Sequence, residues 1–77
     1  MAEEQWQRDV RECPFPMRGR ILDDAMSVLE AGLDSVGFCL CCGDDAYGVE
    51  PDARGYECES CGQRRVYGAE ELIFMLG

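Results

Sequence analysis

Residues 39–62 read CLCCGDDAYGVEPDARGYECESCG, and two matching cysteine pairs bracket this segment. Cys39 and Cys42 form one Cys-x-x-Cys pair, Cys58 and Cys61 form the other, and a glycine follows each pair at once. The 15 residues between the pairs lie at the lower edge of the spacing typical of a four-thiolate zinc site. Two cysteines three residues apart can reach one ion from a tight turn. The sequence therefore predicts that these four cysteines bind one structural Zn²⁺.

Two further cysteines lie outside this pattern. Cys41 offers alternative chelates with Cys39 or Cys42, but only Cys39 with Cys42 repeats the gap and the glycine of the second pair. We therefore expect Cys41 to be a bystander on the turn. Cys13 stands alone in the sequence, and we interpret it as a small buried hydrophobic residue.

Iron is the alternative ion, because it too accepts four sulfurs in a tetrahedron. Rubredoxin-type iron sites share the Cys-x-x-Cys-Gly pairs, but their loops are longer and richer in aromatic residues around the metal. Zinc is therefore the favoured ion for this chain, with iron second.

With 77 residues, the chain has room for one domain. A core of this size rarely contributes more than a few kcal/mol, so small domains usually need an additional cross-link. Structural zinc contributes about 10–16 kcal/mol in finger peptides, so we expect the metal-free chain to be largely unfolded around the site. The metal is the expected cross-link here.

A secreted disulfide scaffold is the other common reason for six cysteines in a short chain. Residues 2–20 contain no apolar run typical of a signal peptide, and tight Cys-x-x-Cys-Gly units suit chelation better than bridging. No apolar run approaches the roughly 20 residues that span a bilayer. We therefore expect a soluble cytoplasmic protein with no membrane contact.

The charge of the chain is lopsided: 16 acids face 7 bases, every base is an arginine, and histidine is absent. Residues 1–20 are neutral overall, so the net charge of −9 belongs to residues 21–77. Zinc binding replaces four thiol protons with two positive charges and moves the net charge toward −11. Proteins that bind DNA or RNA neutralise phosphates with clustered cations. The sequence therefore disfavours direct nucleic-acid binding.

The first 13 residues have a weak helical pattern. Trp6, Val10 and Cys13 would share one side of a short helix. Isolated helices of this length are marginal in water, so we favour a frayed terminal turn whose tryptophan packs on the rest of the chain.

The next segment combines a proline pair with the clearest helical pattern. Residues 14–16, Pro-Phe-Pro, are expected to break any helix and force an extended connection, with Phe15 filling the core. Apolar residues recur at helical spacing over residues 17–31, with acidic residues between them. Gly32 then supplies a natural stop, so residues 17–31 are predicted to form an amphipathic helix.

Three short strands are expected in the cysteine-rich part. Residues 34–37 are interpreted as a connector into the first cysteine pair. Between the pairs, residues 46–50 and 56–57 alternate Tyr or Val with small or charged residues and flank a Pro-Asp…Gly reversal at 51–55, which predicts a hairpin. Residues 65–67 are the predicted third strand.

A second helix is predicted at residues 69–76. Gly68 ends the preceding strand, and Glu70 and Glu71 suit the first turn of the helix. The rest of this segment is apolar almost all round. It should therefore bury most of its surface, either on the helix at residues 17–31 or against another molecule.

Catalysis finds little support in the residues. The chain lacks His and Lys, a Gly-rich phosphate loop and a Gly-x-Ser-x-Gly motif. Four cysteine ligands saturate zinc and leave no position for water. The acid pairs at 23–24, 44–45 and 70–71 are adjacent in sequence, so their side chains point apart and indicate solvated faces. We therefore expect a protein that is not an enzyme.

The cysteine segment resembles the zinc-ribbon class, in which two Cys-x-x-Cys-Gly knuckles hold a three-stranded β unit. Residues 48–62, GVEPDARGYECESCG, followed by VYGAEEL at 66–72, are similar to small phage and prophage zinc-ribbon proteins. The resemblance covers the chain from Phe38 onward, and Cys41 departs from the usual knuckle. It implies the fold and a structural zinc ion, but it supplies no established activity.

The expected architecture is a single α+β domain over residues 1–77. A helical N-terminal extension occupies residues 1–37. The zinc ribbon, with three short antiparallel strands and a Cys₄ zinc site, occupies residues 38–68, and the C-terminal helix occupies residues 69–77.

The leading functional hypothesis is a small acidic zinc protein that acts as a protein–protein interaction module. It would bind through the acidic residues 44–59 or through its C-terminal helix, which also offers a homodimer contact. A sharper version is a phage-encoded inhibitor in the host cytoplasm whose acidic surface imitates nucleic acid. Its partner would then be a basic, nucleic-acid-binding host protein.

Two alternatives remain open. A transcription or nucleic-acid accessory ribbon would depend on Arg54, Arg64 and Arg65 and on stacking by tyrosines. A thiol redox sensor would use Cys41 or Cys13.

Overall fold

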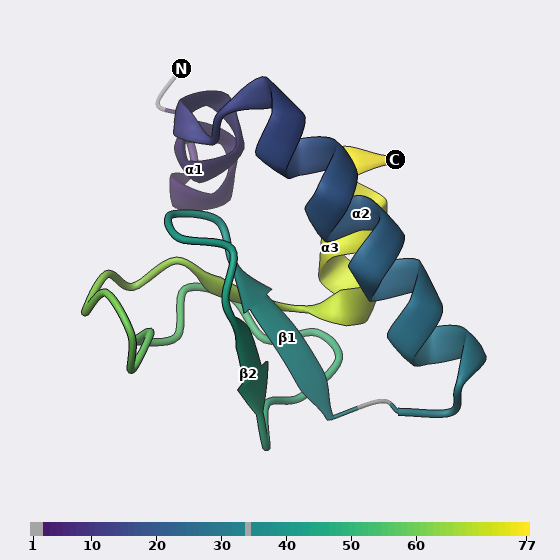
Figure 1. The fold of residues 1–77 in the computed structure, drawn as a ribbon. Helices are drawn as coiled ribbons and strands as arrows, with labels where there is room; N and C mark the ends of the chain where they lie inside the picture. Colours follow the sequence, from purple (N-terminus) through teal and green to yellow (C-terminus); the bar gives the residue numbers. More distant parts are fainter. Residues whose placement is uncertain (1–2, 34) are drawn as a thin grey trace.

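The computed structural model of the chain describes residues 3–33 and 35–77 (Figure 1). Over these residues the helices and strands are, in chain order, α1 (Gln5–Glu12), α2 (Phe15–Glu30), β1 (Val36–Cys39), β2 (Asp45–Tyr47), β3 (Val66–Gly68) and α3 (Ala69–Leu76). The α+β class with three antiparallel strands is confirmed. No helix in the described part of the chain has both the length and the apolar character needed to cross a membrane.

The sheet has the order β2-β1-β3 and separates two small hydrophobic cores. Successive residues of a strand point to opposite faces. Phe38 of β1 lies opposite Tyr67 of β3, and both belong to the core under the helices. The next pair, Cys39 and Val66, belongs to the second core on the other face. We call these the helix side and the metal side of the sheet.

The helix-side core is formed mainly by α2 and α3, which pack against each other (Figure 1). As predicted, α2 is amphipathic, and its Ile21 and Ala25 are completely buried. It begins two residues earlier than expected, and Gly32 follows its end with a φ of +80°, a conformation that glycine adopts at little cost. Trp6 packs against this core, as expected.

The helix break expected at the Pro-Phe-Pro segment is confirmed, because α1 ends at Glu12 and the backbone of Cys13 and Pro14 is extended. The extended connection through residues 15–16 and the buried Phe15 are wrong, because α2 begins at Phe15. Pro14 caps α2 and Pro16 lies in its first turn, where the missing N–H has no helical partner in any case. Phe15 is 80% exposed and does not fill the core. The Arg18 guanidinium lies 5.4 Å from the centre of its ring, so a cation–π contact covers part of it instead.

The frayed turn expected at the N-terminus is also wrong, because the helix α1 forms there. Asp9 is only 1% exposed, and its carboxylate accepts a 2.6 Å hydrogen bond from the Tyr67 hydroxyl of β3. The Arg65 Nε lies 3.4 Å from the same carboxylate, and Arg65 Nη2 donates to Glu12 at 2.8 Å. Burial and the bond to Asp9 raise the pKa of Tyr67. These contacts tie α1 to the sheet and stabilise a helix that would be marginal alone.

The strand pairing differs from the expected hairpin. Residues 34–37 do not all form a connector: Val36 and Gly37 begin the central strand β1, and Asp34 lies outside the described residues. The turn that carries the first cysteine pair links β1 to β2, so this turn makes the hairpin.

The predicted strand at residues 56–57 is reduced to one bridge between Tyr56 and Val66. The strand predicted at 65–67 is confirmed with a shift of one residue, because β3 spans Val66–Gly68. The alternation of residue types along the chain is a local pattern, whereas strand pairing depends on contacts between distant segments. The alternation therefore does not determine which strands pair.

Two facing glycines let the chain between the cysteine pairs cross the metal side of the sheet. Gly37 of β1 lies opposite Gly68 of β3. A Cβ on Gly37 would lie 2.5 Å from the Tyr67 carbonyl oxygen, and one on Gly68 would lie 2.3 Å from the Glu50 carbonyl oxygen. The missing side chain of Gly68 therefore makes room for the backbone of Glu50 and Pro51, and that of Gly37 makes room for the Tyr67 carbonyl and the Val49 side chain.

The helix α3 has the predicted bounds and carries Glu70 and Glu71 in its first turn. Leu72 is completely buried against the helix-side core, as expected for a segment that is apolar almost all round. Phe74 is an exception, with 73% of its surface exposed. The homodimer contact through this helix stays a prediction.

Replacing Gly37 with alanine should lower the free energy of unfolding by about 1–3 kcal/mol, because the new methyl group meets backbone that cannot move away cheaply. Gly19→Ala is the matched control. Gly19 lies within α2, and a Cβ there would meet no other atom within 4 Å, so alanine should raise stability by about 0.5–1 kcal/mol. Thermal unfolding of both variants measures these changes. Equal shifts in the melting temperature of the two variants would contradict the packing role of Gly37.

Candidate metal centre

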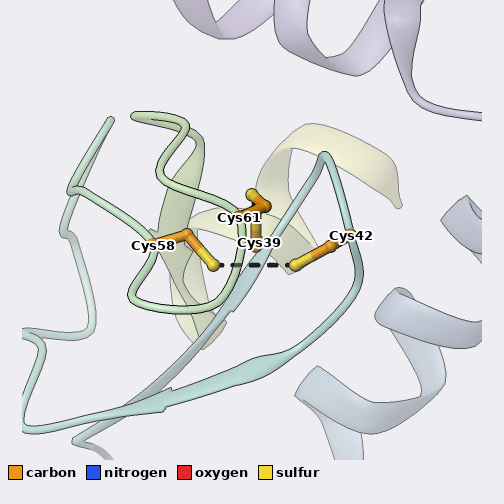
Figure 2. A group of neighbouring side chains, drawn as sticks. All are labelled: Cys39, Cys42, Cys58 and Cys61. Atoms are coloured by element: carbon orange, nitrogen blue, oxygen red, sulfur yellow. Dashed lines mark hydrogen bonds between the residues drawn. The ribbon is translucent and has the colours of Figure 1, made fainter.

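The four predicted ligands come together on the metal side of the sheet (Figure 2). Cys39 is the last residue of β1, and Cys42 lies on the turn that follows it. Cys58 and Cys61 lie on the loop that precedes β3. Their sulfur atoms all lie within 4.8 Å of one another, so the cluster could hold a metal ion.

Two of the sulfur separations match tetrahedral coordination. The Cys39 and Cys61 sulfurs are 3.7 Å apart, and the Cys42 and Cys58 sulfurs are 3.6 Å apart. A tetrahedron with metal–sulfur bonds of about 2.3 Å places its sulfurs about 3.8 Å apart. A disulfide needs about 2.05 Å, and all six cysteines are free thiols. The arrangement therefore suits one ion shared by four thiolates.

The two loops have the same backbone design. The Gly43 N–H donates to the Cys39 carbonyl at 2.9 Å, and the Gly62 N–H donates to the Cys58 carbonyl at 2.8 Å. Both glycines have a positive φ, +82° and +76°, which side-chain-bearing residues adopt only with strain. The glycine after each cysteine pair thus closes the tight turn that brings both sulfurs of the pair to one point.

Backbone N–H groups of the loops point at the sulfurs. The Cys41 N–H donates to the Cys39 sulfur over 3.3 Å. The Gln63 N–H lowers the pKa of Cys61 to about 7. Such bonds favour the thiolate, which is the form that binds a metal.

Burial acts in the opposite direction on the first pair. Desolvation raises the pKa of both Cys39 and Cys42, so these thiols hold their protons at neutral pH when no cation is bound. A divalent cation must displace those protons, and metal affinity therefore rises with pH.

The cluster is closed on its inner side by apolar residues. Cys39 is completely buried and Cys58 is 5% exposed. Val49, Ala53 and Val66 pack against them and form the rest of the metal-side core. Four thiolates would satisfy a tetrahedral ion, so an ion bound here would hold the two loops together and would leave no coordination position for a substrate.

The two remaining cysteines lie outside the cluster. Cys41 is half-buried, its sulfur is not among the four that converge, and burial raises the pKa of its thiol. Cys13 is 2% exposed in the helix-side core, so its interpretation as a buried hydrophobic residue is confirmed.

One supporting contact was not expected from the sequence. Arg20 of α2 donates to the Gly43 carbonyl at 3.4 Å and ties the helix to the first cysteine turn. The Arg20 Nη2 atom lies only 2.1 Å from the position that a Cβ on residue 43 would occupy, so the guanidinium fills the space that Gly43 leaves free. The two residues are 23 positions apart, so no local pattern could have indicated this contact.

Comparison with known protein families, with curated proteins and with solved structures finds no match to this chain. The fold and the cysteine cluster therefore carry the functional argument.

Chelation of the metal should unfold the metal side of the sheet, because the loops around residues 40–43 and 58–62 have few apolar contacts of their own. We expect one ion per chain by elemental analysis and a clear fall in the melting temperature after treatment with a strong chelator. Adding Zn²⁺ back should restore the melting temperature. An unchanged melting curve after complete metal removal would contradict a structural role.

Serine substitutions separate ligands from bystanders. Cys58→Ser should abolish stoichiometric metal binding, because a neutral hydroxyl is a poor substitute for a thiolate. Cys41→Ser and Cys13→Ser are the controls and should keep one ion per chain. Metal content and melting temperature of these three purified variants, and of Cys42→Ser as a fourth, measure this. Loss of the metal from Cys41→Ser, with retention in Cys42→Ser, would show that Cys41 is the ligand in the first pair.

Proposed function

We propose that the chain is a zinc-ribbon protein in which a structural Zn²⁺ holds a small scaffold for binding another protein. Tetrahedral sulfur geometry suits both zinc and iron. The metal-side core around the cluster is built from aliphatic residues and cysteines, whereas rubredoxin-type loops surround iron with aromatic side chains. This composition favours zinc.

The observation that carries the proposal is the combination of a closed metal cluster with an exposed acidic surface. Six carboxylate side chains within residues 44–59 are exposed, namely those of Asp44, Asp45, Glu50, Asp52, Glu57 and Glu59. The metal and its four thiolates add two further negative charges next to them. A metal ion with four thiolate ligands has no open position for catalysis, so we infer that the acidic residues around it serve to bind a partner.

The arginines of the ribbon support a protein partner over a nucleic acid. Arg54 pairs with Glu71 at 2.8 Å, and Arg65 pairs with Glu12 at 2.8 Å. Of the three arginines on which a nucleic-acid ribbon would depend, only Arg64 has no carboxylate partner among the described residues. One cation beside so many acids cannot hold a phosphate backbone.

The sharper form of the proposal is a phage-encoded inhibitor that acts in the host cytoplasm. Its support is the resemblance of residues 48–72 to small phage and prophage ribbons, together with the acidic surface on a minimal scaffold. A surface of this charge attracts the basic channels with which host proteins bind DNA or RNA.

Immobilised zinc-loaded protein should capture a basic, nucleic-acid-binding protein from bacterial lysate. Capture should be strong at about 50 mM salt and lost near 500 mM, because screening shortens the range of the acidic field. A variant with Asp44, Asp45, Glu57 and Glu59 changed to their amides should capture much less at the same metal content.

Two outcomes would contradict the proposal. Partners that bind equally well to the amide variant and at high salt would remove the acidic surface from the mechanism. A gel shift of DNA or RNA by the protein itself at low salt would favour the accessory ribbon instead.

A further inference from the structure

The strand β2 lies at the open edge of the sheet (Figure 1). Its inner side is fully paired with β1. The Cys39 N–H donates to the Asp44 carbonyl at 3.0 Å, and the Gly48 N–H donates to the Ser35 carbonyl at 2.8 Å. Because strand residues alternate in the direction of their backbone groups, the even-numbered residues of 44–48 all face β1.

The odd-numbered residues of this strand face outward. Asp45 and Tyr47 therefore direct two N–H and two C=O groups to the open edge, and no backbone hydrogen bond between the described residues uses them. A row of unpaired backbone groups is a template for one more strand. Natural edges are often protected by proline, by charged side chains or by shortness of the strand; β2 contains no proline or lysine, although it has only three residues and carries Asp45.

A hollow opens beside this edge on the metal side of the sheet. Its volume is about 280 Å³, and its walls come from β2 and from the loop that carries the second cysteine pair. Tyr56, Glu57 and Glu59 line it, and none of its described lining residues is basic. With Asp45 and Tyr47 of β2, the lining of this hollow contains three acidic residues and two tyrosines.

A second hollow opens beside the same edge on the helix side. Its volume is about 440 Å³, and it lies between α2 and the two strands β1 and β2. Val28, Leu33 and Val36 give it an apolar floor, while Asp24 stands among its polar lining. Leu33 is about half exposed and Tyr47 is 74% exposed, so apolar surface is open to a partner here.

An added strand would alternate its side chains between these two hollows. On the metal side the recognised groups are cations, since the lining is acidic and aromatic. On the helix side the floor favours apolar side chains. A second copy of this chain would bring its own Asp45 and Glu57 to the same edge, so charge repulsion disfavours self-association there.

We propose that β2 accepts an extended segment of a partner protein as a fourth strand, with arginine or lysine at alternate positions and apolar residues between them. The basic side chains lie over Glu57 and Glu59, and the apolar ones lie over Leu33 and Tyr47. The segment adds antiparallel or parallel backbone hydrogen bonds to Asp45 and Tyr47. This inference rests on the proposed function as a protein-binding module and defines the kind of sequence that the module reads.

The probe is a short labelled peptide of alternating arginine and valine, titrated into zinc-loaded protein by fluorescence anisotropy. Two further peptides carry backbone N-methyl groups, one at the arginines and the other at the valines. Only one of these two sets directs its N–H groups to β2. One methylated peptide should therefore bind about tenfold or more weakly, while the other binds nearly as well as the parent. Equal binding by both would overturn the proposal.

Tyr47→Pro is the matched protein variant. Proline removes an N–H that faces the open edge and leaves the pairing with β1 intact, which edge strands tolerate. The variant should keep its metal and its melting temperature but bind the parent peptide about tenfold more weakly. If it does not fold, the two methylated peptides still decide the question on the native protein. Absence of any binding by the alternating peptide at low salt would also overturn the proposal.

The outcome is separable from that of the proposed function. A partner captured from lysate equally by native protein and Tyr47→Pro would support the protein-binding module and overturn strand addition. A peptide with the same composition but its arginines and valines in two separate blocks is the control for charge alone, and it should bind more weakly than the alternating peptide. Equal binding of the block peptide and the alternating peptide would show that charge attraction alone explains the binding, and it would overturn strand addition.

Discussion

The convergence of four sulfurs on one point is the constraint on which the metal half of the molecule depends. The core on that side consists of two cysteines and three aliphatic residues, Val49, Ala53 and Val66. Such a cluster offers too little apolar surface to fix two loops and an unpaired crossing segment. An ion that contributes about 10–16 kcal/mol can do so, because it replaces many weak contacts with four strong ones. The sheet and the helices then supply the surface against which the loops rest.

The features that could be predicted from the sequence are those encoded by neighbouring residues. The repeated Cys-x-x-Cys-Gly unit fixes a turn geometry, so the four cysteines that converge could be named from their spacing. The apolar period of α2 and the Gly68 boundary of α3 are equally local, and both helices lie within two residues of their expected ends. The short strand β3 is likewise predicted, to within one residue, from its own residue types and the glycine at its end.

The features that could not be predicted arise from contacts between distant segments. The helix α1 depends on a buried carboxylate, Asp9, whose partner Tyr67 is 58 residues away. The central strand β1 depends on Gly37, because a side chain there would collide with the Tyr67 carbonyl and the Val49 side chain. In the sequence, such a glycine cannot be distinguished from a glycine in a connector. Likewise Pro16 stops a helix in most contexts but begins one here, because of its position in the first turn.

The bond between Asp9 and Tyr67 also determines when the protein can fold during synthesis. The first 30 residues contain α1 and α2, yet the partner of Asp9 lies in β3 and the main partner of α2 is α3, both near the end of the described chain. Until those residues leave the ribosome, the carboxylate of Asp9 lacks its hydroxyl partner, and the apolar stripe of α2 has β1 but not α3 to pack against. Folding is therefore completed only after translation of residue 72, and the growing chain exposes hydrophobic surface until then.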